Sequence, residues 1–148
     1  MASKEDLTFF PAVWNVLHDG EIVAISGSVP GTVALDIDIN YLRRRFHDPG
    51  KIIKLTIIGC THFAYRDFDD SKFITNLSAI EAFKPVIMGA VMRGEICAVD
   101  CLKGPLEVTA TDGSLSLDNG RPVSLEELIS VADAYWKEWS EPPEIDNQ

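Results

Sequence analysis

The sequence lacks the features that mark most secreted and membrane proteins. It has three cysteines, an odd number that cannot all pair within one chain, and none of them stands in a CxxC motif. Reduced thiols fit a cytoplasmic protein best. No apolar run approaches the roughly 18 residues of a membrane span. The first residues show no basic region leading into an apolar run, so we expect neither a membrane anchor nor a secretory signal.

Catalytic motifs are also missing. The sequence contains no GxSxG, no P-loop, no HExxH and no glycine-rich dinucleotide fingerprint. This does not exclude an enzyme, but it leaves no catalytic residue and no cofactor to name. Cys97 and Cys101, together with Cys60 and His62, could in principle form a zinc site, but their spacing matches no zinc knuckle. Buried, inert thiols are the favoured interpretation, and we expect no bound metal.

Basic residues are scarce: 13 lysines and arginines stand against 23 aspartates and glutamates, a formal net charge of −10. Such a charge repels nucleic acid and anionic membranes and favours partners with a basic surface. It also keeps a protein soluble, which is the simpler interpretation.

What the sequence does contain is strand alternation. Around the turn at residues 29–32, residues 21–26 and 33–39 form a predicted hairpin, because proline and glycine together favour a reversal of the chain. In the second strand Asp36 and Asp38 alternate with apolar residues. We therefore interpret them as a solvent-facing pair rather than as a catalytic acid and base.

Further strands are predicted along the rest of the chain. Residues 51–65 form one long bent strand or two in succession, with an interruption at Gly59. The continuous apolar run at residues 86–92 favours a buried strand, and residues 96–102 return after a tight turn. Residues 106–110 and 115–117 are predicted to pair as a hairpin around Asp112-Gly113. Asn119-Gly120 then turns the chain again.

Helices are predicted at three places. Residues 9–17 are apolar and form a short helix or an irregular segment. Ser78 to Glu81 has capping-box spacing, which predicts a short helix that ends before Pro85. Ser124 to Glu127 is a second capping box and opens the C-terminal helix. Its apolar stripe recurs every three or four residues: Leu125, Leu128, Ala132, Tyr135, Trp136 and Trp139.

Together these elements predict a single α+β domain over residues 1–148. It has one antiparallel β-meander sheet of about seven or eight strands, a short mid-chain helix and a C-terminal helix packed on the sheet. The polar ends, residues 1–8 and 140–148, are predicted to be flexible.

The candidate binding site is the segment that contains Tyr41, Arg43, Arg44 and Arg45. Arginine between aromatic residues is typical of protein interaction sites, and also of nucleic-acid patches, which the acidic remainder argues against. The alternative is internal: the arginines pair with Asp36, Asp38 or the acidic second half of the chain. In a mixed case, one arginine pairs with a carboxylate inside the protein and the other two remain available to a partner. This case combines the two interpretations.

The chain resembles small, functionally uncharacterised bacterial proteins in three places: LHDG at residues 17–20, YLR at 41–43 and GRPVSLEEL at 120–128. The resemblance implies a β-meander closed by a helix, and its motifs are structural turns and caps. In size and acidity the chain is also similar to some immunity proteins of contact-dependent toxin systems, a likeness that implies no residue roles.

Two classes of function follow. The first is a non-enzymatic, cytoplasmic protein-binding module, such as an immunity-like inhibitor of a basic toxin. The alternative is a small enzyme or small-ligand binder with a pocket between sheet and helix.

Overall fold

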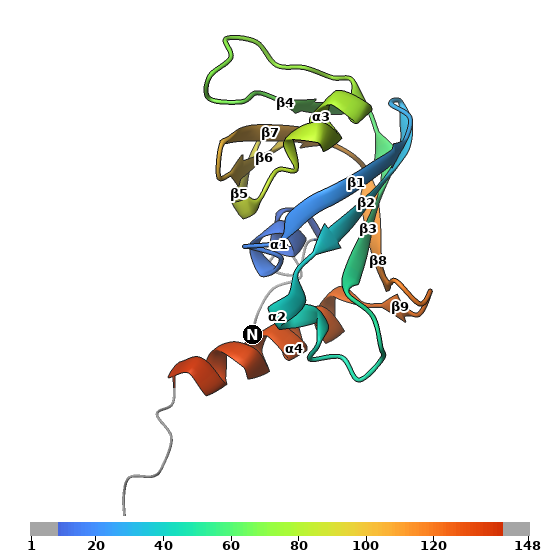
Figure 1. Cartoon of the computed structure of the whole chain (residues 1–148). Coiled ribbons are helices and arrows are strands. Elements are labelled where there is room, and N and C mark those ends of the chain that lie inside the picture. Colours follow the sequence, from blue (N-terminus) through green and yellow to red (C-terminus); the bar gives the residue numbers. More distant parts are fainter. Residues whose placement is uncertain (1–8, 141–148) are drawn as a thin grey trace, which may run out of the picture.

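The computed structural model describes residues 9–140, with side chains as far as residue 138. The predicted flexible ends, 1–8 and 141–148, lie outside the described residues, and residue 140 ends the last helix (Figure 1). The helices are α1 (Phe9–Val16), α2 (Asn40–Arg43), α3 (Leu77–Phe83) and α4 (Leu125–Ser140). The strands are β1 (Glu21–Gly27), β2 (Gly31–Asp38), β3 (Ile52–Cys60), β4 (His62–Tyr65), β5 (Ile87–Arg93), β6 (Ile96–Cys101), β7 (Gly104–Thr109), β8 (Asp112–Leu117) and β9 (Pro122–Val123).

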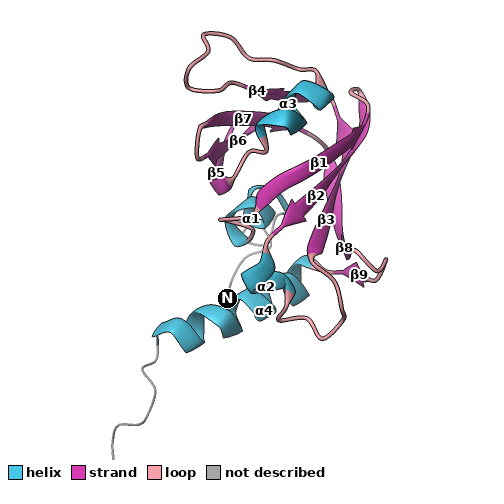
Figure 2. Cartoon of the chain, in the orientation of Figure 1, coloured by secondary structure: helices cyan, strands magenta, loops and turns pink. Residues whose placement is uncertain are grey.

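The predicted α+β class with antiparallel strands is confirmed. The strands, nine in the described range, divide between two sheets (Figure 2). Sheet A has the order β1-β2-β3-β8-β9 and sheet B the order β4-β7-β6-β5. The predicted first hairpin is present as β1 and β2, with Asp36 paired to the exposed Lys54 on its solvent side.

The two sheets are joined where neighbouring strand segments bend together. β3 leads into β4 at residues 60–62, and β7 leads into β8 at residues 109–112, so both strand segments pass from one sheet to the other at one corner. Gly59 has φ +65°, and a Cβ there would lie 2.3 Å from the Oγ1 of Thr111. The Thr111 backbone N–H donates to the carbonyl of Ile58 at 3.0 Å. The break predicted at Gly59 is therefore the corner itself, because only glycine fits this conformation and this close approach.

The predicted hairpin at Asp112-Gly113 is wrong. β7 pairs with β4 and β6 in sheet B, whereas β8 pairs with β3 and β9 in sheet A. The chain does not reverse there, because Thr111 continues the ladder along the bent β3–β4 segment. Gly113 instead makes room for α1: a Cβ there would lie 2.3 Å from the ring of Phe9.

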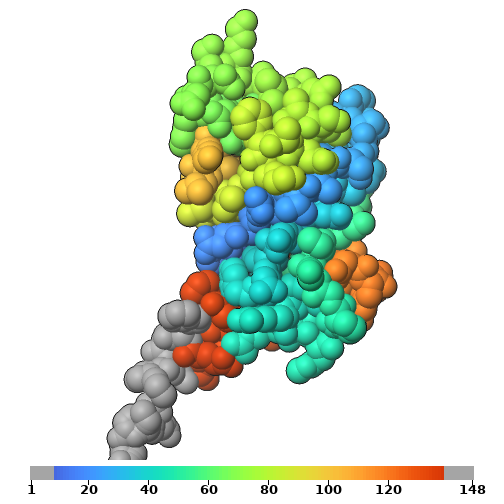
Figure 3. All heavy atoms as spheres, in the orientation of Figure 1, coloured from blue at the N-terminus to red at the C-terminus, as the bar shows by residue number. Residues whose placement is uncertain are grey.

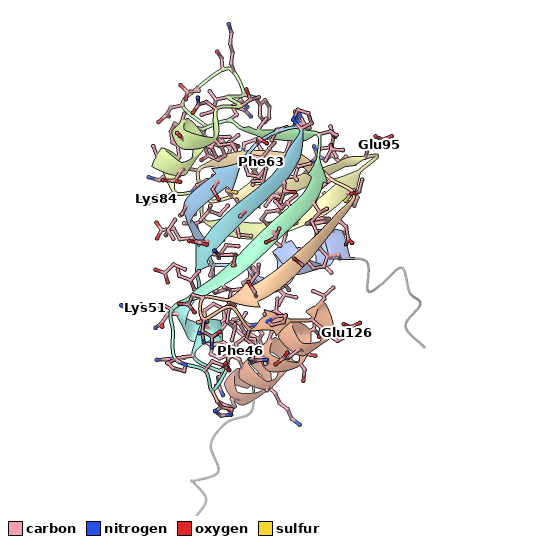
Figure 4. The ribbon with its side chains drawn as sticks, turned by 90° about the vertical axis from the view of Figure 1, so that its right-hand side faces the viewer. Phe46, Lys51, Phe63, Lys84, Glu95 and Glu126 are labelled. Carbon is pink, nitrogen blue, oxygen red and sulfur yellow. The ribbon has the colours of Figure 1, made fainter. Side chains whose placement is uncertain are left out.

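Helix α1 fills the space between the sheets and contacts β5, β6 and β8 (Figure 1). Its Val13 and Trp14 are buried in one apolar cluster that spans both sheets, and Phe63 of β4 belongs to the same interior (Figure 4). The side-chain amide of Asn15 bonds to both backbone groups of Ala90, accepting from its N–H at 2.9 Å and donating to its carbonyl at 3.0 Å. The outer edge of β5 is therefore partly covered.

Two local predictions need correction. The run at residues 86–92 is not a fully buried strand: β5 is an edge strand, and Met88, Val91 and Met92 are exposed. The Ser78–Glu81 capping box is also wrong. The N-cap of α3 is Asn76, whose side chain accepts from the backbone of Ala79 at 2.9 Å, and Glu81 instead accepts from the backbone of Ile25 in β1.

Helix α4 begins at the predicted capping box, with the Ser124 hydroxyl accepting from the backbone N–H of Glu127 at 3.0 Å. It lies across the end of sheet A and contacts mainly α1 and α2 (Figure 1). Leu125, Leu128 and Ala132 are buried as predicted, but Trp136 is 40% exposed. The apolar stripe thus leaves the core after two turns, and the side chain of Trp139 lies outside the described set.

Candidate functional site

The arginine segment contains one fully buried charge. Arg43, at the end of α2, is 0% exposed. Its Nε donates to the carbonyl of Ile52 and to Oδ1 of Asp118, both at 3.1 Å. Its two Nη atoms donate to the carbonyls of Asp48 and Pro49 at 2.8 and 2.9 Å, and Nη2 also donates to Oδ1 of Asp118 at 2.7 Å. Arg43 therefore holds the loop at residues 44–51 from inside.

Asp118 completes this arrangement from the end of β8. Its Oδ2 accepts from the backbone N–H groups of Lys51 and Ile52 at 2.8 and 3.1 Å. Partial burial opposes ionisation, but the hydrogen bonds from Lys51, Arg43 and Ile52 together lower the pKa of Asp118 to about 2. Gly50 is required beside the pair, because a Cβ there would lie 2.2 Å from both Arg43 Nη2 and Asp118 Oδ1.

A second contact fixes the same loop from outside. The carboxylate of Asp48 accepts from Arg121 Nε at 3.0 Å and from the Asn119 amide at 3.0 Å. The Arg121 guanidinium also lies 5.9 Å above the ring of Phe46. The hydrogen bonds from Arg121 and Asn119 hold the pKa of the Asp48 carboxyl below its usual value. The loop is thus a rigid support for the side chains that project from it.

The next two arginines lie at the surface. Arg45 forms a bidentate ion pair with Glu138 of α4, and its guanidinium lies 5.2 Å from the ring centre of Tyr135. Arg44 is exposed, and none of the interactions found among the described residues involves its side chain. The expectation that at least one arginine pairs with a carboxylate is confirmed, at Asp118 and at Glu138.

Beside Arg44 the surface forms a shallow cleft of about 410 Å³ between this segment and α4. Figure 3 shows the two regions side by side on one face, α2 and the following loop in cyan and α4 in red. One wall carries basic and imidazole side chains and the other carries small ones: Arg44, Arg45 and His47 on the first, and Ser130, Val131 and Ala134 on the second.

Tyr41, the remaining predicted site residue, belongs to an aromatic cluster. Its hydroxyl donates to the carbonyl of His18 at 2.8 Å, and its ring centre lies 4.7 Å from that of Tyr135. Burial, with Asp19 and Tyr135 nearby, raises the pKa of Tyr41 to about 12. Trp136 stacks on His18 at 5.3 Å in the same cluster. Tyr41 thus attaches α4 to the rest of the protein.

The structure brings only part of the predicted site to one surface. Arg44 and Arg45 line the cleft, Tyr41 is half-buried and does not line it, and Arg43 lies entirely inside the protein. Sequence reasoning missed Asp118 and the small residues of α4. Asp118 stands between the apolar Leu117 and the Asn119-Gly120 turn. This position at the end of a strand was the one feature of the sequence that could have indicated its role.

A second, smaller and more enclosed hollow of about 280 Å³ lies away from this cleft, where the start of β1, the segment after α3 and the β6–β7 turn meet. It is lined by Glu21, Tyr65, Phe83, Lys84, Pro85, Val86, Leu102 and Lys103. We call it the Tyr65 pocket.

The three cysteines are buried, as the strand pattern indicated. Burial raises the pKa of Cys97 to about 11, and burial together with Asp100 raises that of Cys101 to about 12. The His62 ring bonds to Glu107 at 3.0 Å, and the Cys60 thiol donates to the backbone carbonyl of His62 at 3.4 Å rather than facing the ring. Within residues 9–140 no three His, Cys, Asp or Glu side chains are grouped so as to hold a metal ion.

Comparisons with known proteins found no matching family model, no matching curated protein and no matching solved structure. Across the described part of the chain, no helix has the length and apolar character that a membrane span requires.

Proposed function

We propose that this protein is a non-enzymatic, cytoplasmic protein-binding module that contacts its partner through the cleft between Arg44 and α4. One observation carries the proposal: Arg44 is an exposed cation without an ion-pair partner among the described residues, on a loop that Arg43 and Asp48 hold rigidly. A pre-positioned charge loses little conformational entropy on binding, which favours a recognition role. Arginine is also the residue best suited to bidentate contact with a carboxylate.

The charge distribution supports a particular kind of partner. The net charge of −10 attracts a protein whose surface is basic overall and raises its rate of association. The cleft itself is locally basic and receives one acidic side chain of that partner. A basic toxin domain that an immunity-like protein would inhibit is one class of partner with these properties.

The test is capture of the partner from the source organism with purified, tagged protein. Wild type and Arg44→Glu are compared with Arg93→Glu, which makes the same charge change at the exposed β5–β6 turn. We expect the same partner with wild type and Arg93→Glu, and at least a tenfold reduction with Arg44→Glu. Equal recovery with all three proteins would exclude the cleft as the contact surface.

Small-ligand binding or a small enzyme is the alternative function. The observation that favours ligand binding is the Tyr65 pocket, which lies between α3 and the end of sheet B. It is smaller than the cleft beside Arg44, about 280 Å³ against about 410 Å³, and more enclosed.

A further inference from the structure

The Tyr65 pocket is built by backbone contacts that bring three distant segments together. Glu21 at the start of β1 pairs with Val86, and the Ile22 N–H donates to the carbonyl of Pro85 at 2.8 Å. The Leu102 N–H donates to the carbonyl of Val86 at 2.9 Å. The walls are therefore fixed to the sheets, and the pocket is part of the fold rather than a gap between mobile loops.

Tyr65 lines the pocket and is 1% exposed. No residue in the described range forms a hydrogen bond with its hydroxyl. Although the ring is buried, the hydroxyl is not among the fully buried polar atoms that lack a partner, so it keeps some exposed surface and a partner can reach it. Since Tyr65 lines the pocket, a ligand there can accept a hydrogen bond from it. Burial also raises the pKa of Tyr65 to about 12, so the hydroxyl remains a donor at neutral pH.

The rest of the lining combines apolar walls with positive charge. The Phe83 ring lies 5.3 Å from the Tyr65 ring, and Leu102, 58% exposed, stands at the mouth. Lys84 and Lys103 line the pocket, and neither has a carboxylate within ion-pair distance among the described residues. Two lysines against Glu21 leave the lining with a net positive charge, in a protein that is otherwise strongly acidic.

Lys84 owes its place to the helix end. It is the C-cap of α3 in the left-handed conformation, φ +46°, and Pro85 follows it. Figure 4 shows Lys84 at the end of α3, well separated from Lys51, which lies toward the α4 end of the molecule. The left-handed residue ends the helix and so fixes the position from which the Lys84 side chain joins the pocket lining.

From these observations we infer that the Tyr65 pocket binds a small carboxylate with an apolar body. The carboxylate accepts from the Tyr65 hydroxyl and from the ammonium groups of Lys84 and Lys103, and the apolar part lies against Phe83, Pro85 and Leu102. The volume of about 280 Å³ is near the lower end of the range for ligand sites, about 300–1,000 Å³, so the ligand is small. This inference is independent of the protein-binding cleft, which lies elsewhere on the surface.

The experiment is a titration followed by ¹H–¹⁵N NMR, with three probes of nearly the same size: phenylacetate, 2-phenylethanol and phenethylammonium. Phenylacetate is expected to shift the amide signals around residues 83–86 and 102–103, with a Kd on the order of 1 mM, as befits about ten non-hydrogen atoms. The neutral and cationic probes should bind at least about threefold more weakly, since they lack the anion.

Variants separate the contributions of the pocket residues. Lys84→Gln and Lys103→Gln should each weaken phenylacetate binding about threefold, and Tyr65→Phe should do the same without lowering the melting temperature. Lys51→Gln removes the same charge away from the pocket and should leave the affinity unchanged. Equal affinity for all three probes, shifts confined to other residues, or no effect of the two lysine changes would overturn the inference. None of these results depends on Arg44, so the protein-binding proposal is tested separately.

Discussion

Arg43 is the residue whose environment departs most from its sequence context. It stands in a run of three arginines in which charge repulsion and solvation both suggest a surface position. Its guanidinium nevertheless has acceptors on every side, three backbone carbonyls and the Asp118 carboxylate. A buried charge with this many partners is tolerated, but it becomes costly as soon as the arrangement is broken.

Serine substitutions at Arg43 and Arg44 should therefore have very different effects on the stability of the fold. Arg43→Ser should lower the free energy of unfolding by about 3–5 kcal/mol, because it leaves Asp118 and the loop carbonyls without their donor. Arg44→Ser should leave the melting temperature unchanged, since its side chain forms no hydrogen bond or ion pair among the described residues. Denaturant melts of both variants measure the difference. Equal losses would contradict the assignment of Arg43 to the interior.

The pH dependence of stability should show the contribution of Asp118. Its folded pKa of about 2 lies below the value of about 3.9 in an unfolded chain. The stabilisation it provides is therefore complete above about pH 4 and is lost as the pH falls toward 2. Asp118→Asn should therefore lose less stability than the wild type as the pH falls from 4 to 2. Thermal melts of both proteins between pH 2 and 5 test this prediction. Parallel curves of melting temperature against pH would argue against a stabilising Arg43–Asp118 pair.

The cysteines should be unreactive while the protein is folded. Burial raises the pKa of Cys97 to about 11 and that of Cys101 to about 12, so little thiolate exists at pH 8. We expect a disulfide reagent to modify the native protein about 100-fold more slowly than the unfolded chain. Rapid labelling of Cys97 without denaturant would show that the edge of sheet B opens readily.

Among the helices and strands, the sequence predicted correctly those features that depend on residues close together in the chain. The β1–β2 hairpin and the start of α4 were both correct, because the turn at residues 29–32 and the Ser124 cap depend on nearby residues. The cap of α3 was not, since Glu81 is used by the backbone of Ile25, far away in the sequence. The exposure of β5 could not be predicted either, because a continuous apolar run does not distinguish a central strand from an edge strand.

The anchoring of α4 should be concentrated in its first half. Leu128→Ala should cost about 2–5 kcal/mol, because Leu128 is fully buried. Trp136→Ala should cost only about 1–2 kcal/mol, because its ring is partly exposed and its contacts are those with His18, Tyr41 and Tyr135. Denaturant melts compare the two. A larger loss at Trp136 would mean that the projecting half of the helix is part of the core.

For the whole molecule, the decisive feature is the corner at which two neighbouring strands cross between the sheets. Alternation predicted the strands and Gly59 indicated the break. Nothing in the local pattern distinguished a hairpin at Asp112-Gly113 from a chain that continues into a second sheet. That choice depends on Thr111, which bonds to Ile58 across the corner. The sequence indicated a single meander sheet, whereas the structure has two sheets; the antiparallel pairing of neighbouring strands was predicted correctly.

Gly59 and Gly94 provide a matched test of the corner, since both have φ +65°. Alanine at Gly94 meets nothing within 4 Å and should cost only the conformational strain, about 1–2 kcal/mol. Alanine at Gly59 carries the same strain and in addition clashes with Thr111, so it should cost clearly more. Melts of both variants decide the question, and equal losses would show that the corner can relax around a side chain.

The contact between Asn15 and Ala90 has a consequence for self-association. Edge strands with free backbone groups are templates for pairing with other chains. Here the amide of Asn15 occupies both backbone groups of Ala90, and residues 19–20 bond to Ile87 on the same edge. Protection of β5 therefore depends on α1 and residues 19–20 remaining in place. Local release of this segment, well short of global unfolding, would expose an apolar strand edge, so the rate of aggregation should follow the opening of residues 9–20 rather than the melting of the sheets.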